Sequence, residues 1–512
     1  MNVLCHGTPF CSVESTLPLY AGPHDVRTIG KDADARYSYN PRKETWNEVI
    51  ARIRSEWKPD LVLCWTPELC PPPLGIEDST IRTVALVSDW NILYPLLAVN
   101  LSRYDLVLCD KPGVEVFSSG YVTPQHLFPL YSQVSVMHRP LPIPKDLDVA
   151  FAGNLNHAAH PVRGRYLQRL AAMSDRYRIF IGKEILGEDY VRLYNRAHIV
   201  FNHSIRGELN LRVFETMACG SMALLEESNL EVRGWFADGR ELVLYNDENF
   251  EERVSYYIEH PAEAQAVAAR GHTRTPEFAA ENRLTRLIDW CAAQPSSGRR
   301  FHELPPEEQD YQNVLMYGYS FYPVFQEVEE RLLARAMQSL PEDPRLWTAL
   351  GRHFINPYNP ARHEPQNQER FLKAFLHAHR LDPSSAPRAL NLASLYRMLG
   401  NDDQEAHYLQ LALEAKSLGG ADLVSGNHIC SFWQRWQRAV ATKNASLETL
   451  HAEVRIRLAV ILAKHGAVEL AEDHLRQAAI LDAANTNGIR LWAEIRWSSG
   501  LREEAIDLVR HA

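Results

Sequence analysis

Short apolar runs alternate with amphipathic stretches over roughly the first 290 residues of the chain. Runs of four to six residues bounded by Gly, Pro or polar residues are typical of buried strands, and the longer mixed stretches between them are typical of helices. The expected strands are Asn2–Cys5, Leu61–Trp65, Thr83–Val87, Asp105–Cys109, Asp148–Ala152, Arg178–Gly182, His198–Asn202, Met222–Leu225 and Leu242–Tyr245. Strands that alternate with helices predict parallel, doubly wound sheets.

A cluster of prolines (Pro140, Pro142 and Pro144) divides this alternation in two. Helices are expected between the strands on both sides of it: Lys43–Trp57, Arg163–Met173, Glu188–Ala197, Leu211–Cys219 and Phe250–Glu259. We therefore expect an α/β arrangement of two Rossmann-like domains, at 1–143 and at 144–292, whose sheets face each other across a cleft. The composition of 293–304, with Gln294-Pro295-Ser296-Ser297-Gly298, is typical of a linker.

The remainder of the chain has a helical pattern with an internal period. Gly466 and Gly500 are 34 residues apart, as are Ala471 and Ala505, and Gly400 precedes Gly466 by 66 residues, close to two periods. A helix–turn–helix unit of this length predicts an all-α, tetratricopeptide-like repeat domain over 305–512. Such units stack into a solenoid with a groove, because one helix pair cannot cover its own apolar face.

Composition narrows the class of protein. The 512 residues carry a formal net charge of -10, which argues against a general nucleic-acid binder but not against a local anion site. We expect neither a signal peptide nor a membrane span, because no apolar run is long enough, and therefore a cytoplasmic protein. The eight cysteines lack paired Cys-x-x-Cys spacing, so reduced and mostly buried thiols are expected.

The stretch His198–Glu227 reads as strand, loop, helix and strand. In an open parallel sheet, ligands bind at the carboxyl ends of strands, so the loop at 203–210 is placed where a phosphate would lie. Asn210 is expected at the N-cap of the next helix, with Gly220 ending it. Arg212 and Glu215 share a helix face, which suits a diphosphate and a ribose, or else a plain surface ion pair; spacing alone leaves both open.

The run NLRVFETMACGSMALLEE resembles the nucleotide-binding helix of group 1 GT-B glycosyltransferases, especially the CgeB-like branch. The residues that match its Asn-x-Arg-x-Phe-Glu-x-x-Ala-Cys-Gly pattern are Asn210, Arg212, Phe214, Glu215, Ala218, Cys219 and Gly220. Asp148–Asn156 is similar to the first strand and glycine loop of that family, and Tyr256–Thr275 to its tail helix. The resemblance covers about residues 145–290 and is only architectural before them.

The resemblance implies a hexosyltransferase-like enzyme that takes sugar from a nucleotide-sugar donor, releases a nucleoside diphosphate and uses no cofactor. By this resemblance, residues 1–143 would be the acceptor-side domain and residues 144–292 the nucleotide-sugar-binding domain. Glu215 would bind the ribose, Gly153 and Asn154 would line the phosphates, and Arg163 and Arg165 would offset the diphosphate charge. Asn210 and Arg212 would complete the donor site.

The spacing of two glutamates departs from the family pattern, and two Asp-x-Asp sequences raise the question of a metal ion. Related enzymes carry two Glu eight positions apart, whereas Glu208 and Glu215 are seven apart, so a role of Glu208 on the sugar and a retaining mechanism are both undecided. Asp32-Ala33-Asp34 and Asp146-Leu147-Asp148 both spell the Asp-x-Asp pattern of metal-dependent GT-A enzymes, but two Rossmann-like domains favour a metal-independent reaction. His157, His160 and His203 lack the spacing of a zinc site.

The catalytic base should follow a strand of the first domain, since it must reach the acceptor across the cleft. His6 and Asp89 are the two candidates. Each also has a plainer interpretation, His6 as a loop residue and Asp89 as a helix N-cap, and a substrate-assisted reaction would need no protein base.

Three functions fit these expectations. The first is a bacterial transferase whose repeat domain presents a protein or peptide acceptor, since its domain content resembles protein O-glycosyltransferases, including flagellin-modifying ones. The second is a transferase acting on a glycan or lipid-linked acceptor. The third is a non-enzymatic repeat scaffold with a degenerate transferase half, which the intact Asn210, Arg212 and Glu215 set disfavours.

Overall fold

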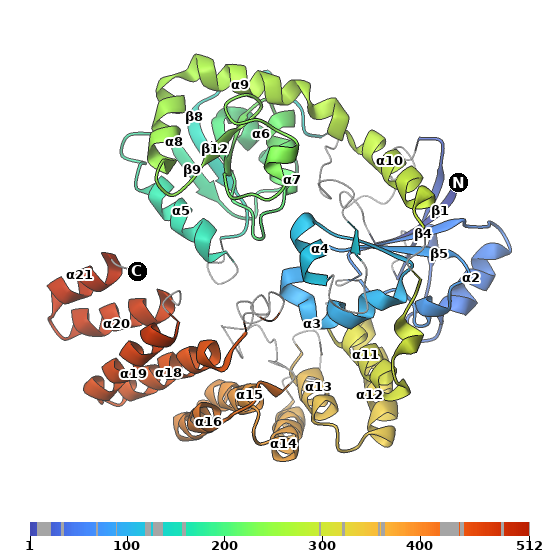
Figure 1. Cartoon of the computed structure of the whole chain (residues 1–512), viewed down its shortest axis with the longest axis vertical. Coiled ribbons are helices and arrows are strands. Elements are labelled where there is room, and N and C mark those ends of the chain that lie inside the picture. The colour runs from blue at the N-terminus through green and yellow to red at the C-terminus, as the bar shows by residue number, and fades with distance from the viewer. Residues whose placement is uncertain are drawn as a thin grey trace. The chain divides into compact units, whose positions relative to one another are not determined.

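The computed structural model describes residues 1–7, 22–31, 35–67, 70–88, 90–117, 124–125, 137–155, 160–295, 298–319, 323–356, 359, 364–419, 440, 445–482 and 486–510. The chain forms two compact units, Met1–Leu304 and Pro305–Ala512 (Figure 1). The first unit contains two parallel sheets and the second is helical. The expected α/β region followed by an all-α region is thus confirmed.

The first sheet has seven parallel strands in the order β3-β2-β1-β4-β5-β6-β7. Their bounds are β1 (Asn2–His6), β2 (Asp25–Gly30), β3 (Tyr37–Ser38), β4 (Leu61–Trp65), β5 (Arg82–Leu86), β6 (Leu106–Leu108) and β7 (Pro124–Gln125). The accompanying helices are α2 (Trp46–Arg54), α3 (Trp90–Asn100) and α4 (Lys111–Phe117), with 3-10 turns at η2 (Ile76–Asp78) and η3 (Leu101–Arg103). Every residue of β4 is buried, as expected of a central strand covered on both faces.

The second sheet has five parallel strands in the order β12-β11-β10-β8-β9. Their bounds are β8 (Leu147–Ala152), β9 (Ile179–Gly182), β10 (Ala197–Phe201), β11 (Met222–Glu226) and β12 (Val243–Tyr245). The helices are α5 (Pro161–Ala171), α6 (Gly187–Arg196), α7 (Leu211–Ala218), α8 (Phe250–Glu259), α9 (Pro261–Thr273) and α10 (Ala280–Ala293), with 3-10 turns at η4 (Val232–Gly234) and η5 (Thr275–Phe278). All five residues of β11 are buried, which indicates that both faces of the sheet are covered at this strand.

Helix α10 packs against the first sheet. Its Leu284, Leu287 and Ile288 share a core with Val3 of β1 and Leu63 of β4. The sequence pattern groups 280–292 with the second domain, but hydrophobic burial attaches this segment to the first. The two sheets are therefore joined by a returning helix as well as by the chain between β7 and β8.

The helical unit consists of helix pairs. Its helices are α11 (Pro306–Gly318), α12 (Pro323–Ser339), α13 (Pro344–Ile355), α14 (Pro365–Leu381), α15 (Ala386–Met398), α16 (Asp402–Glu414), α18 (Leu447–Lys464), α19 (Val468–Leu481), α20 (Thr486–Ser498) and α21 (Arg502–Arg510), preceded by the 3-10 turn η6 (Phe301–Glu303). The strongest packing is within the pairs α11 with α12, α13 with α14, α15 with α16, α18 with α19, and α20 with α21.

The periodic glycines lie at the turns inside three of these pairs. Gly400, Gly466 and Gly500 have φ of +71°, +78° and +84°. The residue after each glycine donates its backbone N–H to the carbonyl five positions earlier in the chain, as in Asn401 to Tyr396 at 2.9 Å and Leu501 to Arg496 at 2.9 Å. This is the Schellman ending of a helix, which needs a left-handed residue. The period thus marks helix–turn–helix units, and their tetratricopeptide identity stays a prediction.

Buried ion pairs stabilise neighbouring pairs of the helical unit. Glu329 of α12 accepts from Arg352 Nη2 at 2.7 Å and lies 2.9 Å from His353 Nδ1. Arg457 of α18 donates to Glu405 of α16 at 2.6 and 3.1 Å and to Ser394 Oγ of α15 at 2.7 Å. Each buried cation is matched by a carboxylate, as burial of charge requires.

Most expected elements of the second sheet are confirmed to within one or two residues, while β2, β3 and β7 were not predicted. The described cysteines (Cys5, Cys64, Cys70, Cys109, Cys219 and Cys291) are free thiols, and all but Cys70 are buried. Within the described ranges, none of the helices combines the length and the apolar character that crossing a membrane requires.

Candidate functional site

A cavity of about 1440 Å³ lies at the carboxyl ends of β8, β9 and β10. Its wall is built from the segments that follow these strands, from the first turns of α6 and α7, from Met137 and His138 before β8, and from Ser88 after β5. Of the residues expected in the donor site, Gly153, Asn154, Arg163, Asn210, Arg212 and Glu215 line it. The parallel sheet thus brings these six residues, which are up to 62 positions apart in the sequence, to one edge of the sheet.

Arg212, one residue into α7, is held by the ends of the neighbouring strands. Its Nη1 donates to Asn202 Oδ1 at 2.7 Å, and its Nη2 donates to the Ala152 carbonyl at 2.9 Å. Nε lies 3.1 Å from the Tyr194 hydroxyl. These contacts fix the guanidinium on the cavity wall, where its charge acts on whatever occupies the cavity.

Gly153 is required by the approach of this arginine. A Cβ built on Gly153 would lie 2.4 Å from Arg212 Nη2 and 3.1 Å from Phe151 Cζ. Any side chain at this position would displace the guanidinium. The glycine of the strand-end loop therefore acts through Arg212 as well as by exposing its own backbone.

Arg163 of α5 is the second cation of the wall. It is 5 % exposed, and its Nε and Nη2 both donate to the His203 carbonyl, at 2.9 and 2.7 Å. Burial, followed by the positive charge of Arg212, lowers its pKa to about 10. Its guanidinium forms no ion pair within 4 Å among the described residues, and the carboxylates of Glu208 and Glu226 act on it only from farther away. A bound anion would therefore stabilise this buried charge further.

Glu215 lies one turn deeper on α7, on the same face as Arg212. Its Oε2 accepts from the Tyr190 hydroxyl at 2.7 Å, and its Oε1 is 3.6 Å from His138 Nε2. Burial lowers the pKa of His138, although the Glu215 charge opposes this. The carboxylate is 16 % exposed, which leaves it able to accept hydrogen bonds from a hydroxyl-bearing ligand.

The loop between β10 and α7 carries Arg206 and Glu208 into the wall. Arg206 donates to Asp110 Oδ2 at 2.9 Å and to Asn91 Oδ1 at 2.7 Å, so it reaches residues that follow strands and begin helices of the first sheet. Glu208 accepts the Arg206 backbone N–H at 2.8 Å, and burial raises its pKa. Both side chains thus shape the loop, and the sugar-binding role of Glu208 stays open.

Several buried polar atoms around the cavity have no hydrogen-bond partner among the described residues: Asn202 Nδ2, Asn210 Oδ1 and His160 Nδ1. Asn210 occupies the N-cap of α7 as expected, but its side chain makes no cap hydrogen bond. Burial and the nearby Arg163 lower the pKa of His160 to about 3. Buried polar groups are seldom left unsatisfied, so this concentration indicates the position of a polar ligand.

Two other candidates, Arg165 and His6, are not among the residues that line the cavity. Arg165 is paired with Asp247 at 3.1 Å on the surface, because a residue two positions from Arg163 lies on the far side of the helix. His6 is fully buried at the end of β1 with Nε2 3.0 Å from the Tyr39 hydroxyl, and burial lowers its pKa to about 4. Asp89 lies outside the described residues.

Of the two Asp-x-Asp sequences, the structure describes only Asp146-Leu147-Asp148. Asp146 pairs with Arg196 at 2.7 Å and Asp148 with Arg178 at 2.9 Å, so both carboxylates are already matched by guanidinium groups. Asp32, Ala33 and Asp34 lie outside the described residues, as does His157. In the part of the chain that the structure describes, no three His, Cys, Asp or Glu side chains are grouped as metal ligands would be.

Tyr190, His138, Arg206 and Lys183 belong to the cavity wall and were not predicted. Tyr190 could have been found from its position in the first turn of α6, which opens at the same sheet edge as α7. No local sequence pattern indicates a role for His138. It lies in the segment of the chain between the strands of the first and the second sheet, and it reaches the cavity only through tertiary packing.

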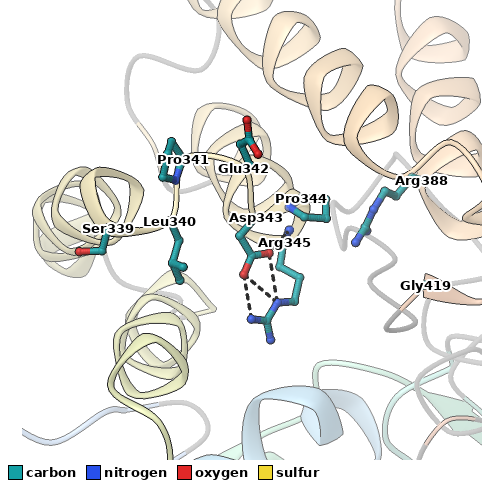
Figure 2. A pocket seen from close by; sticks show the side chains of 9 residues that line it. All are labelled: Ser339, Leu340, Pro341, Glu342, Asp343, Pro344, Arg345, Arg388 and Gly419. Atoms are coloured by element: carbon teal, nitrogen blue, oxygen red, sulfur yellow. Dashed lines mark hydrogen bonds and ion pairs between the residues drawn. The ribbon is translucent and has the colours of Figure 1, made fainter.

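The helical unit carries a separate, open depression of about 590 Å³ around the turn Leu340–Asp343, with Arg345 and Arg388 on its sides (Figure 2). Asp343 and Glu308 accept from Arg345, in each case at 2.8 Å, and Arg388 Nε is 3.3 Å from Asp382. Its arginines are therefore matched by carboxylates, unlike Arg163 of the larger cavity.

Residues 137–289 match the family described as "Glycosyl transferase-like". This range spans the whole second sheet and every cavity residue except Ser88. The chain thus contains a glycosyltransferase-like domain, and the match supports sugar transfer. No curated protein sequence matches the chain.

Solved structures show a distant likeness to the chain. Sucrose-phosphate synthase from Thermosynechococcus elongatus is 11% identical and covers 57% of this chain and 99% of its own, with a TM-score of 0.38. Anabaena HepE in complex with UDP-glucose is 11% identical over 57% of this chain and 100% of its own, with a TM-score of 0.39. The pneumococcal O-GlcNAc transferase GtfA is 14% identical over 45% of this chain and 56% of its own, with a TM-score of 0.33. At such low scores these structures say nothing of what this chain binds.

Proposed function

We propose that this chain is a GT-B glycosyltransferase that binds a nucleotide-sugar in the cavity beside β8 and β10 and transfers the sugar without a metal ion. The observation that carries the proposal is the buried Arg163, whose guanidinium donates to the His203 carbonyl and is under the influence of the positive charge of Arg212. Two neighbouring guanidinium groups that form no ion pair with a carboxylate among the described residues fit a diphosphate.

Two parts of a nucleotide-sugar, the diphosphate and the ribose, can be matched to groups of the cavity wall. The diphosphate would lie against Arg163 and Arg212 and along the backbone of Gly153 and Asn154, since these four line one wall. The Glu215 carboxylate would accept hydrogen bonds from the ribose hydroxyls. Charge that develops on the leaving diphosphate would be stabilised by these fixed cations and by the N-terminus of α7, as a metal ion does in other transferases.

Of the two candidate bases, Asp89 is the one we favour. It follows Ser88 directly in sequence, and Ser88 lines the cavity. Asp89→Asn should abolish transfer while donor affinity stays within twofold of wild type. His6 is less suited, because its Nε2 is engaged by Tyr39 and its ring has no exposed surface.

The acceptor that we propose is a protein or peptide, held with help from the helical unit. Support comes from the fusion of a transferase-like region with stacked helix pairs, which commonly present a groove for extended peptides. A chain that ends at residue 304 should hydrolyse donor and lose transfer to the protein acceptor. Retained transfer by this shortened chain would instead favour a glycan or lipid-linked acceptor.

The decisive experiment is calorimetric titration with UDP-, GDP-, CMP- and dTDP-sugars, each with and without EDTA. We expect one class to bind, with equal affinity in both conditions. Absence of heat from all four would contradict sugar transfer and favour a scaffold. Glu215→Ala should then weaken the binding by about 1 to 3 kcal/mol, the usual cost of lost hydrogen bonds to a charged group, whereas unchanged affinity would refute the ribose assignment.

A further inference from the structure

The loop Asn202–Asn210 forms much of the cavity wall, yet it has no regular secondary structure of its own. A loop that presents ligand-binding groups must be held by contacts from the scaffold behind it. Several contacts of this loop lead to one buried side chain, Glu226, at the end of β11.

Glu226 is 3 % exposed, and a single one of its oxygens organises the loop. Oε1 accepts the backbone N–H of Ser204 at 3.0 Å and also the Ser204 hydroxyl. The same Ser204 Oγ accepts the backbone N–H of Gly207 at 3.0 Å. One carboxylate oxygen therefore closes the turn that sets Arg206 into the wall.

A second branch runs from the same oxygen through Asn229. Asn229 Nδ2 lies 3.2 Å from Glu226 Oε1 and donates to the Glu208 carbonyl at 2.7 Å. Gly207, between the two branches, has φ of +90°, and its carbonyl accepts the Leu230 N–H at 2.8 Å. The loop is thus held from Ser204 to Glu208 by contacts that begin at Glu226.

The other oxygen, Oε2, is buried and has no hydrogen-bond partner among the described residues. The titratable and charged groups that face Glu226 are His203 of the loop, Tyr245 of β12 and Arg163 of α5. His203 Nδ1 is 3.8 Å from Oε2, and the His203 carbonyl is the acceptor for Arg163. Glu226 therefore lies behind the cation on which the proposed function rests.

We propose that Glu226 is a positioning residue of the donor site, which fixes the loop Asn202–Asn210 from behind and tunes the positive field that Arg163 presents to a nucleotide-sugar diphosphate. This inference rests on the proposed function. Glu226 does not touch the cavity itself, so it acts through Ser204, Asn229 and Arg163.

The position of Glu226 near Arg163 predicts that donor affinity depends on pH. Burial raises the pKa of Glu226 to about 7, against hydrogen bonds from Ser204 that lower it. A proton on Oε2 would leave the hydrogen bonds to Oε1 in place and remove a negative charge near Arg163. Donor affinity should therefore be higher below pH 7 and fall as Glu226 ionises. A nucleotide-sugar suits the test, because its esterified phosphate groups do not titrate near neutrality.

The experiment is titration of the best-binding nucleotide-sugar from the panel at pH 6, 7 and 8, with the full chain and three variants. For wild type we expect affinity to fall about three- to tenfold from pH 6 to 8, the size of a single charge interacting at moderate distance. Glu226→Gln keeps an acceptor for Ser204 and should bind with the low-pH affinity throughout. Glu226→Ala removes the acceptor and should bind about tenfold more weakly at every pH.

Glu227→Gln is the matched control. Glu227 is the next residue, 43 % exposed and paired with Arg233 on the surface, so its variant should retain the wild-type pH profile. If Glu226→Gln keeps the wild-type step, another group is responsible for the pH dependence and the proposal is overturned. A flat wild-type profile also overturns it.

The two proposals fail in different ways. Absence of binding by wild type for any nucleotide-sugar overturns the proposed function and this inference with it. Wild-type binding with an unchanged profile in Glu226→Gln overturns only the role of Glu226. Should Glu226→Ala fail to fold, the comparison of wild type, Glu226→Gln and Glu227→Gln still decides.

Discussion

Buried arginines occur in two settings in this chain. In the helical unit, Arg457 donates to the Glu405 carboxylate from 2.6 Å and also reaches Ser394. On helix α5, beside the second sheet, Arg163 donates to the His203 carbonyl, and the positive charge of Arg212 acts on it. The first arrangement satisfies its own charge and stabilises the packing of helices, whereas the second leaves charge for a ligand to satisfy. Burial of a charged residue is therefore a weak sign of function until its partners are named.

The largest effect should follow from breaking a matched pair. Arg457→Met leaves Glu405 buried without its partner, so we expect the free energy of unfolding of the helical unit to fall by about 3 to 5 kcal/mol. Urea denaturation followed by circular dichroism would measure it. The double variant Arg457→Met with Glu405→Met should recover most of the loss, and a loss that persists would mean that the pair is not the cause.

The next largest effect is expected at His6, whose burial favours the neutral imidazole. His6 has its pKa lowered from 6.5 to about 4 by burial, so the unfolded chain binds a proton at a higher pH than the folded chain does. The folded state should therefore lose up to about 3 kcal/mol as the pH falls from 6.5 to 4. Denaturation at pH 7, 5.5 and 4 should show this loss in wild type and a smaller one in His6→Gln. Parallel curves for the two proteins would contradict it.

Removal of the unmatched cation should act on binding and spare stability. Arg163→Met takes away a buried charge that lacks a carboxylate partner, so we expect an unchanged or slightly higher melting temperature. Nucleotide-sugar affinity should fall by about 1.5 to 3 kcal/mol, the usual value of a hydrogen bond to a charged group. Thermal melting and calorimetric titration would test both parts. A melting temperature that falls as far as that of Arg457→Met would remove the distinction between the two settings.

The smallest effect is expected at Arg165, two residues from Arg163 in the sequence. Arg165 is more than half exposed, and its ion pair with Asp247 lies on the surface. Arg165→Met should change both stability and donor affinity by less than about 0.5 kcal/mol. Because it matches Arg163→Met in chemistry and element, it is also the control for that variant.

The sequence predicted the second sheet well because each of its strands is a short apolar run with a clear end. β11 and α8, for example, differ from the expected spans by one residue or none. The strand β2 was missed because Asp25-Val-Arg-Thr-Ile-Gly mixes charge with β-branched residues and follows Pro23-His24, which reads as a loop. A partly exposed strand near a sheet edge carries too weak a pattern to be distinguished from its surroundings.

The candidate site was predictable where residues follow strands and not where they arrive by packing. Gly153, Asn154 and Arg212 lie together because parallel strands end at one sheet edge, which the sequence order already implies. Arg165 was grouped with Arg163 by proximity in sequence, although the helical period turns it away. The contribution of His138, and the burial of His6, depend on tertiary contacts that no local pattern contains.

The turns at Gly400, Gly466 and Gly500 have one more consequence. A Cβ at any of these positions would meet no heavy atom within 4 Å, so nothing but backbone handedness requires glycine there. An L-residue is disfavoured by its own chirality, while a D-alanine would adopt the same φ without strain. Semisynthesis with D-alanine at these turns should therefore stabilise the helix pairs, since it restricts the unfolded chain and leaves the folded backbone as it is. Mirror-image residues would be accommodated at three matching points of one repeating architecture.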